Sequence, residues 1–74
     1  MIIFIKLLDG TKHEFIVNDN ITIAQLKYNI QDKLNINNYT QRLLYKGYSM
    51  LDEYTLKQYN VTENSIIFLL FQLF

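Results

Sequence analysis

The start of the chain combines an apolar run with an alternating one. Residues 1–7 are rich in isoleucine, and residues 11–17 alternate in polarity, with His13 and Phe15 on one side. Side chains point to opposite faces of a strand with a period of two, so both segments are predicted to be strands. Asp9-Gly10 between them is a strong turn signal, because glycine tolerates positive φ and aspartate caps its own turn. The pattern therefore predicts a β-hairpin.

Apolar residues then recur at helical spacing. Across residues 23–34 they fall three or four positions apart, at Ile23, Leu26, Ile30 and Leu34. Thr22 and Gln25 form a capping box, in which each side chain can satisfy a free backbone N–H at a helix start. Asn35 follows, and asparagine is the commonest residue after glycine in the left-handed C-cap conformation. One amphipathic helix is predicted here.

The second half of the chain reads mainly as strands. Residues 41–45 and 48–51 are strand candidates around a turn at Gly47, and residues 65–73 form a final, almost wholly apolar strand. Leu56 and Tyr59 between them suit one helical turn. The order predicts an α+β fold, with a mixed sheet of four to five strands and one main helix packed on one face. We expect residues 1–74 to form one domain.

A single helix can cover only one face of this sheet, and the other face should then be polar. The residues expected to face the helix are Ile3, Ile5, Leu43, Tyr45, Ile67 and Leu69. Their neighbours, which should face away, are also apolar: Ile2, Phe4, Leu44, Ile66, Phe68 and Leu70. Lys6, Arg42 and Gln72 would give this surface a polar rim, as in protein–protein interfaces. The pattern predicts a binding surface for a partner protein; the alternative is cover by a second copy or by the rest of a larger protein.

Composition narrows the possible partners. Half of the residues are hydrophobic, so the chain should fold, and seven basic and seven acidic residues are dispersed along it. Without a basic run, nucleic acid is not expected as a partner. No apolar run approaches the roughly 20 residues of a membrane span, so no membrane association is expected. The lack of cysteine excludes disulfides and thiolate chemistry, and favours a cytoplasmic or nuclear location.

Candidate catalytic residues are few. His13 is the sole histidine and has no evident nucleophile as a partner, so a structural role is expected for it. Asp52 and Glu53 are adjacent in a predicted surface loop, whereas acid–base catalysis needs carboxyl groups that converge in a cleft. We therefore expect no enzyme activity, no metal site and no cofactor.

The chain resembles the ubiquitin family over essentially all 74 residues, and specific residues carry this resemblance. They are the Asp9-Gly10 turn, the helix 23–34 with Ile30-Gln31-Asp32-Lys33, then Ile36, Gln41-Arg42-Leu43 with Gly47, then Asp52, Thr55-Leu56 and Tyr59-Asn60, and the closing segment 65–73. The resemblance implies the β-grasp fold, in agreement with the element order.

The resemblance also implies binding positions. Those of the family's main apolar patch are Leu8, Leu44 and Leu70, flanked by Lys6, Arg42, Gly47 and Phe68. Tyr48 borders this patch and is a candidate contact, because aromatic residues are enriched at hot spots. Those of a second patch are Leu8, Ile36, Phe71 and Leu73, and a third small patch maps onto Phe4. The partners it implies are ubiquitin-binding domains, proteasome subunits and ubiquitin-processing enzymes, bound without a covalent bond.

The chain departs from conjugating members of the family at its end. It finishes Phe71-Gln72-Leu73-Phe74, without the two glycines through which those members are activated, so this chain as given is not expected to be conjugated. The alternative is a covalent modifier whose Gly-Gly tail follows residue 74. Weak self-association through the apolar sheet face is a further possibility.

Overall fold

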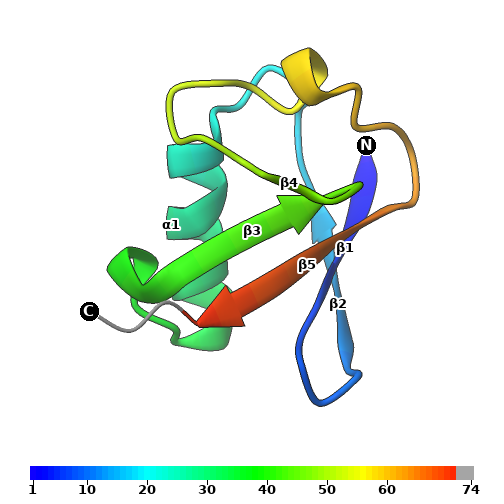
Figure 1. Ribbon diagram of the computed structural model, residues 1–74. Coiled ribbons are helices and arrows are strands. Elements are labelled where there is room, and N and C mark those ends of the chain that lie inside the picture. Colours follow the sequence, from blue (N-terminus) through cyan, green and yellow to red (C-terminus); the bar gives the residue numbers. More distant parts are fainter. Residues whose placement is uncertain (72–74) are drawn as a thin grey trace.

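The computed structural model describes residues 1–71, which form a five-stranded mixed sheet and one main helix (Figure 1). The strands are β1 (Ile2–Lys6), β2 (Lys12–Ile16), β3 (Gln41–Tyr45), β4 (Tyr48–Ser49) and β5 (Ser65–Phe71). The main helix is α1 (Ile23–Leu34), and the 3-10 turns are η1 (Asn38–Thr40) and η2 (Lys57–Tyr59). The α+β fold class expected from the sequence is confirmed.

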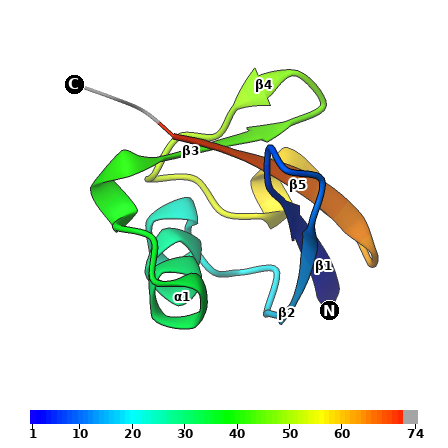
Figure 2. The ribbon, with the colours of Figure 1, turned by 90° about the horizontal axis from the view of Figure 1, so that it is seen from below.

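The sheet has the strand order β2-β1-β5-β3-β4. β1 pairs antiparallel with β2 and parallel with β5, and β3 pairs antiparallel with β5 and β4. The first and last strands therefore lie side by side in the sheet, and β5 links β3 and β4 to the β1–β2 hairpin. α1 packs along one side of the sheet (Figure 2).

α1 begins and ends where the sequence predicts. The Thr22 hydroxyl accepts a hydrogen bond from the Gln25 backbone N–H at 3.1 Å, which is the N-cap half of the capping box. Asn35 closes the helix in the left-handed conformation at φ 58°. Leu26 and Ile30 are fully buried, so the predicted apolar face is the one that packs on the sheet.

The predicted inward side of the sheet forms the core. All of its members are buried: Ile3, Ile5, Leu43, Tyr45, Ile67 and Leu69. β4 ends at Ser49 and is shorter than the expected strand over residues 48–51; Met50 is buried in the core, and its N–H donates to the Leu43 carbonyl at 2.8 Å. The expected final strand is confirmed as far as Phe71; residues 72 and 73 lie outside the described chain.

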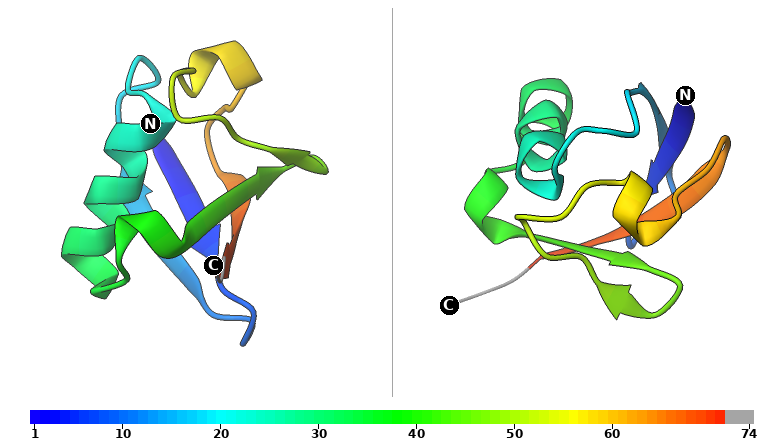
Figure 3. Two further views of the ribbon diagram at one scale, coloured as in Figure 1. Left: turned by 60° about the vertical axis from the view of Figure 1, so that its left-hand side comes forward. Right: turned by 90° about the horizontal axis from the view of Figure 1, so that it is seen from above.

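The segment that contains η2 closes one end of the core beside the start of α1 (Figure 3). Leu56 is fully buried, and its N–H donates to the Ile21 carbonyl at 3.2 Å. Asn60 follows η2 in the left-handed conformation, at φ 59°. Because this segment and α1 bury their apolar residues in the same core, they leave the far side of the sheet to solvent within residues 1–71.

Candidate protein-binding surface

The side of the sheet that faces away from α1 gathers the residues of the predicted main patch; we call it the outward face. Lys6 pairs with Phe68, and Phe68 pairs with Leu44, so these three residues lie side by side across β1, β5 and β3. Arg42 pairs with Leu70 further along. The structure thus brings together positions that are more than sixty residues apart in the sequence.

The apolar side chains of the outward face remain accessible. Phe68 is 47% exposed, and Leu44 and Leu70 are half-buried. Leu8 lies in the turn after β1 and is 73% exposed. Solitary exposed leucines are ordinary, but a contiguous apolar group on a small monomer marks a surface that other molecules contact.

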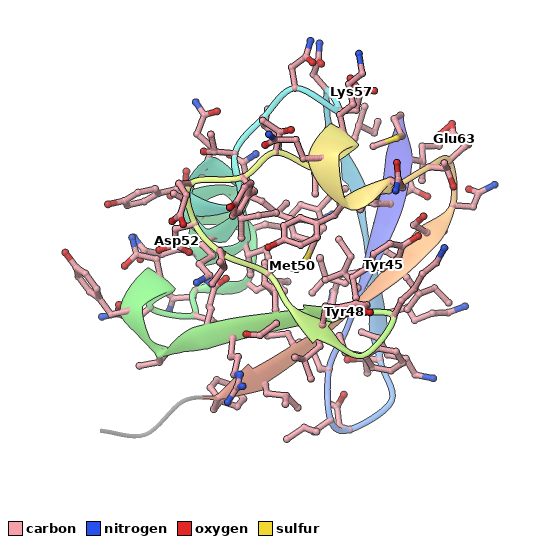
Figure 4. All side chains as sticks on the ribbon, turned by 45° about the horizontal axis from the view of Figure 1, so that its top comes forward. Tyr45, Tyr48, Met50, Asp52, Lys57 and Glu63 are labelled. Atoms are coloured by element: carbon pink, nitrogen blue, oxygen red, sulfur yellow. The ribbon has the colours of Figure 1, made fainter. Side chains whose placement is uncertain are left out.

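Polar groups border this apolar centre. The Nζ of Lys6 lies 5.8 Å from the centre of the Phe68 ring, and the Arg42 Nε donates to the Ser49 hydroxyl at 3.3 Å. Gly47, in the turn between β3 and β4, is exposed and has φ 81°. Tyr48 projects from the same hairpin and is 71% exposed (Figure 4). An apolar centre with a polar rim is the anatomy of a non-obligate protein interface.

The predicted second patch takes a different position. Ile36 is half-buried and packs against the core, and its carbonyl accepts from the Gln41 side chain. Phe71 is exposed and pairs with Gln41 across β3 and β5. Gln41 is an inward residue of β3, so Ile36 and Phe71 gather around it rather than beside Leu44. Of the other two predicted positions, Leu8 lies in the turn after β1 and Leu73 lies outside the described residues.

Gln41 is a structural residue that the sequence pattern does not reveal. Its side chain is 2% exposed, and its Nε2 donates to the carbonyls of Lys27 at 2.9 Å and Ile36 at 3.1 Å. These bonds tie α1 and the segment after it to the start of β3. A glutamine at the first position of a strand is expected at the surface. Its hydrogen-bond partners here are backbone carbonyls of other segments, which the local pattern does not reveal.

The turn that carries Leu8 is fixed by a carboxylate. Asp9 accepts hydrogen bonds from the Thr11 N–H at 2.9 Å and from the Thr11 hydroxyl at 2.7 Å. These bonds favour the ionised carboxyl and lower the pKa of Asp9 below its usual 3.8. These hydrogen bonds stabilise the Asp9-Gly10 turn that the sequence predicts.

Residues 1–71 hold no group of three or more histidine, cysteine or acidic side chains that could bind a metal ion. Within the same residues, no helix is both long and apolar enough to span a bilayer. His13 is half-buried, and its Nε2 lies 3.4 Å from the Thr11 hydroxyl.

The sheet order, with the first and last strands parallel at its centre and one helix across it, defines a β-grasp domain. The chain belongs to the ubiquitin family: that family's model matches residues 3–73. It is 38% identical over 61 residues to ubiquitin-like protein 4A of Rattus norvegicus, covering 82% of this chain and 39% of the relative. It is 36% identical over 67 residues to the UV excision repair protein RAD23 homolog of Dictyostelium discoideum, covering 90% of this chain and 20% of that protein. The chain therefore spans well under half the length of these relatives.

Proposed function

We propose that this ubiquitin-like domain binds protein partners of the ubiquitin pathway without catalysis, through its outward face. The partners are ubiquitin-binding domains, proteasome subunits or ubiquitin-processing enzymes, met in the cytoplasm or nucleus. The main support for the proposal is the accessible row of Lys6, Phe68 and Leu44, on a sheet whose other face carries the core. The matched relatives, a ubiquitin-like protein and a RAD23 homolog, agree with a role in that pathway.

The geometry favours a modest, reversible interaction. Leu44 and Leu70 are already half-buried against the sheet, so they are positioned before a partner arrives and lose little rotamer freedom on binding. Phe68 supplies an aromatic surface at the centre, and aromatic residues are enriched among interface hot spots. Arg42 and Lys6 stand at the edge, where charges contribute to partner choice and association rate more than to affinity.

Titration of the chain with a panel of ubiquitin-binding domains tests the proposal. Leu44→Ala should weaken binding by about 1–3 kcal/mol, a loss of roughly 5- to 150-fold in affinity. Tyr28→Ala is the control, because Tyr28 is an exposed residue of α1 and does not lie on the outward face. Isothermal calorimetry gives both affinities. Unchanged binding by Leu44→Ala, or an equal loss in both variants, would contradict the proposal.

A further inference from the structure

Tyrosines gather around η2 and the β3–β4 hairpin, where two neighbouring hollows of about 370 Å³ and 350 Å³ open. The first hollow is lined by Tyr54, Gln58 and Tyr59. The second is lined by Gln58 and Tyr59 again, together with Tyr45, Lys46, Tyr48 and Asn60. Gln58 and Tyr59 are shared, so they form a ridge between the two hollows. We call the ridge with its two hollows the η2 site; β1 and β5 contribute none of its lining residues.

The aromatic ring at the ridge is held in place. The Tyr59 hydroxyl accepts a hydrogen bond from the Leu51 N–H at 2.7 Å, and the Tyr54 and Tyr59 rings meet edge to face with their centres 5.9 Å apart. Tyr54 is 41% exposed and Tyr59 is half-buried, so aromatic surface remains open to a ligand. Side chains that are already fixed lose little conformational entropy when a ligand binds them.

The side-chain amide of Gln58 supplies a hydrogen-bond donor at the same ridge. Thr55 and Gln58 form both halves of a capping box: the Gln58 N–H donates to the Thr55 hydroxyl at 3.2 Å, and the Gln58 Oε1 accepts from the Thr55 N–H at 2.9 Å. These bonds orient the amide and use its oxygen. Its Nε2 donates to no group within residues 1–71, and the residue is exposed. The ridge therefore presents an oriented donor that lacks an acceptor in the domain.

A single charged side chain, that of Lys46, is found among the described residues that line the η2 site. Lys46 is exposed in the turn between β3 and β4, and its Nζ lies 5.4 Å from the centre of the Tyr45 ring. Tyr45 pairs with Tyr48 across the hairpin (Figure 4). The salt bridge found among residues 1–71 joins Lys27 to Asp52 and does not involve Lys46. A carboxylate is therefore the complementary group for this end of the site.

We propose that the η2 site binds a proline-rich segment of a partner protein in the polyproline II conformation, with an acidic residue beside Lys46. This binding is additional to the proposed function, because it needs no contact with the outward face. A polyproline II helix has no internal hydrogen bonds, so its carbonyls are free to accept from the Gln58 amide. Aromatic-lined grooves are a recurring surface for such segments.

The repeat of the polyproline II helix suits a ridge with a hollow on each side. The helix has three residues per turn and rises about 3.1 Å per residue, so prolines three positions apart lie on one side of it, about 9 Å apart. Two such prolines can pack on either side of the Tyr59 ring, one in each hollow. The segment is extended before it binds, which lowers the entropy cost of ordering it.

Other occupants fit this chemistry less well. The carbonyls of an α-helix are bonded within the helix except in its last turn, so a docked helix would leave the Gln58 donor unused. An added strand pairs with the backbone of a sheet edge, whereas side chains line the η2 site. The 74 residues contain no proline, so a second copy of them cannot supply the segment.

The probe is a capped synthetic peptide with a Pro-Pro-Ala repeat and glutamates at its ends. It is titrated into ¹⁵N-labelled chain, and both backbone and side-chain amide signals are followed. The side-chain amide of Gln58 and the backbone amides of residues 54–60 should shift. A comparison peptide with alanine at every proline should bind at least about fivefold more weakly, because it must first be ordered and lacks the ring contacts.

Two substitutions test the ridge, with a glutamine-ended form of the peptide as the ligand so that no charge repulsion enters. Gln58→Glu keeps the acceptor that the capping box uses and removes the donor, and Tyr54→Leu removes an aromatic face. Each should weaken binding at least about threefold. Gln25→Glu makes the same change in the capping box of α1, and Tyr39→Leu changes a tyrosine that is 76% exposed in η1. These two controls should bind normally, and thermal unfolding checks that every variant is folded.

The charged end of the site has its own test. The unaltered chain should prefer the glutamate-ended peptide to the glutamine-ended one, and added salt should reduce this preference. Lys46 has φ 51°, a left-handed conformation that asparagine tolerates, so Lys46→Asn removes the charge without strain in the turn. This variant should bind both peptides equally. Equal binding of the two peptides by the unaltered chain would refute the acidic residue beside Lys46.

Three results would overturn the inference as a whole. The first is no binding of the proline peptide, or equal binding of the proline and alanine peptides. The second is normal binding by both Gln58→Glu and Tyr54→Leu. The third is a set of shifts centred on Phe68 and Leu44, with none in residues 54–60. None of these results decides the proposed function, which the titration with ubiquitin-binding domains tests separately.

Discussion

Truncation of Leu43 in β3 should mainly weaken folding stability, whereas truncation of its neighbour Leu44 should mainly weaken partner binding. Leu43 is 0% exposed and belongs to the core, whereas Leu44 points outward and is half-buried. Leu43→Ala removes a fully packed side chain and leaves a cavity, which costs about 2–5 kcal/mol. Leu44→Ala loses only partial burial on an open surface, and its cost should not exceed about 1.5 kcal/mol. Binding should show the reverse order, since Leu44 lies on the interface.

Urea unfolding followed by far-UV circular dichroism measures both stabilities. A domain of this length has a total stability of about 4–11 kcal/mol, so Leu43→Ala removes a large share of it. With a denaturant slope of about 1 kcal/mol per molar urea, the two midpoints should differ by about 0.5 M or more. Equal losses of stability for the two variants would contradict this prediction, because Leu44 would then be as necessary to the fold as Leu43.

Further effects follow from the hydrogen bonds of single side chains. Gln41→Leu should cost about 1–3 kcal/mol in urea unfolding, because the carbonyls of Lys27 and Ile36 lose their buried donor; a stability equal to that of the unaltered chain would contradict this. The lowered pKa of Asp9 means that its carboxyl binds a proton less readily in the folded state than in the unfolded state. The contribution of the ionised carboxyl to stability is therefore complete above about pH 4, and it is lost as the pH falls through the pKa of the folded state. Asp9→Asn, which cannot ionise, should flatten this part of the acid-unfolding curve, and an unchanged curve would show that the Thr11 bonds do not set the pKa.

Local signals in the sequence predicted the elements well. The bounds of α1 follow from Thr22, Asn35 and the spacing of apolar residues, all of which act within a few residues. Alternation separated the core residues of β1, β3 and β5 from the outward ones, because a strand's side chains have a fixed period. The same alternation revealed more apolar strand surface than one helix covers, which is the origin of the candidate site.

Features that depend on distant pairing could not be derived from these patterns. Phe4, Ile66 and Phe68 are contiguous because β1 lies beside β5. Local periodicity carries no information on this strand order. The burial of Gln41 likewise depends on carbonyls from α1 and the segment after it. The opposition of Lys6 and Lys12 follows from the hairpin register, which the turn sets and the sequence pattern alone did not show.

Chemical-shift mapping shows directly which face of the domain a partner contacts. A ubiquitin-binding domain is added to the ¹⁵N-labelled chain, and the amide shifts of residues 1–71 are followed. We expect the largest shifts in β3, β5 and the turn with Leu8, and no change in the exposed residues of α1, such as Tyr28. Shifts concentrated on α1, with none at Leu44 and Phe68, would contradict this expectation.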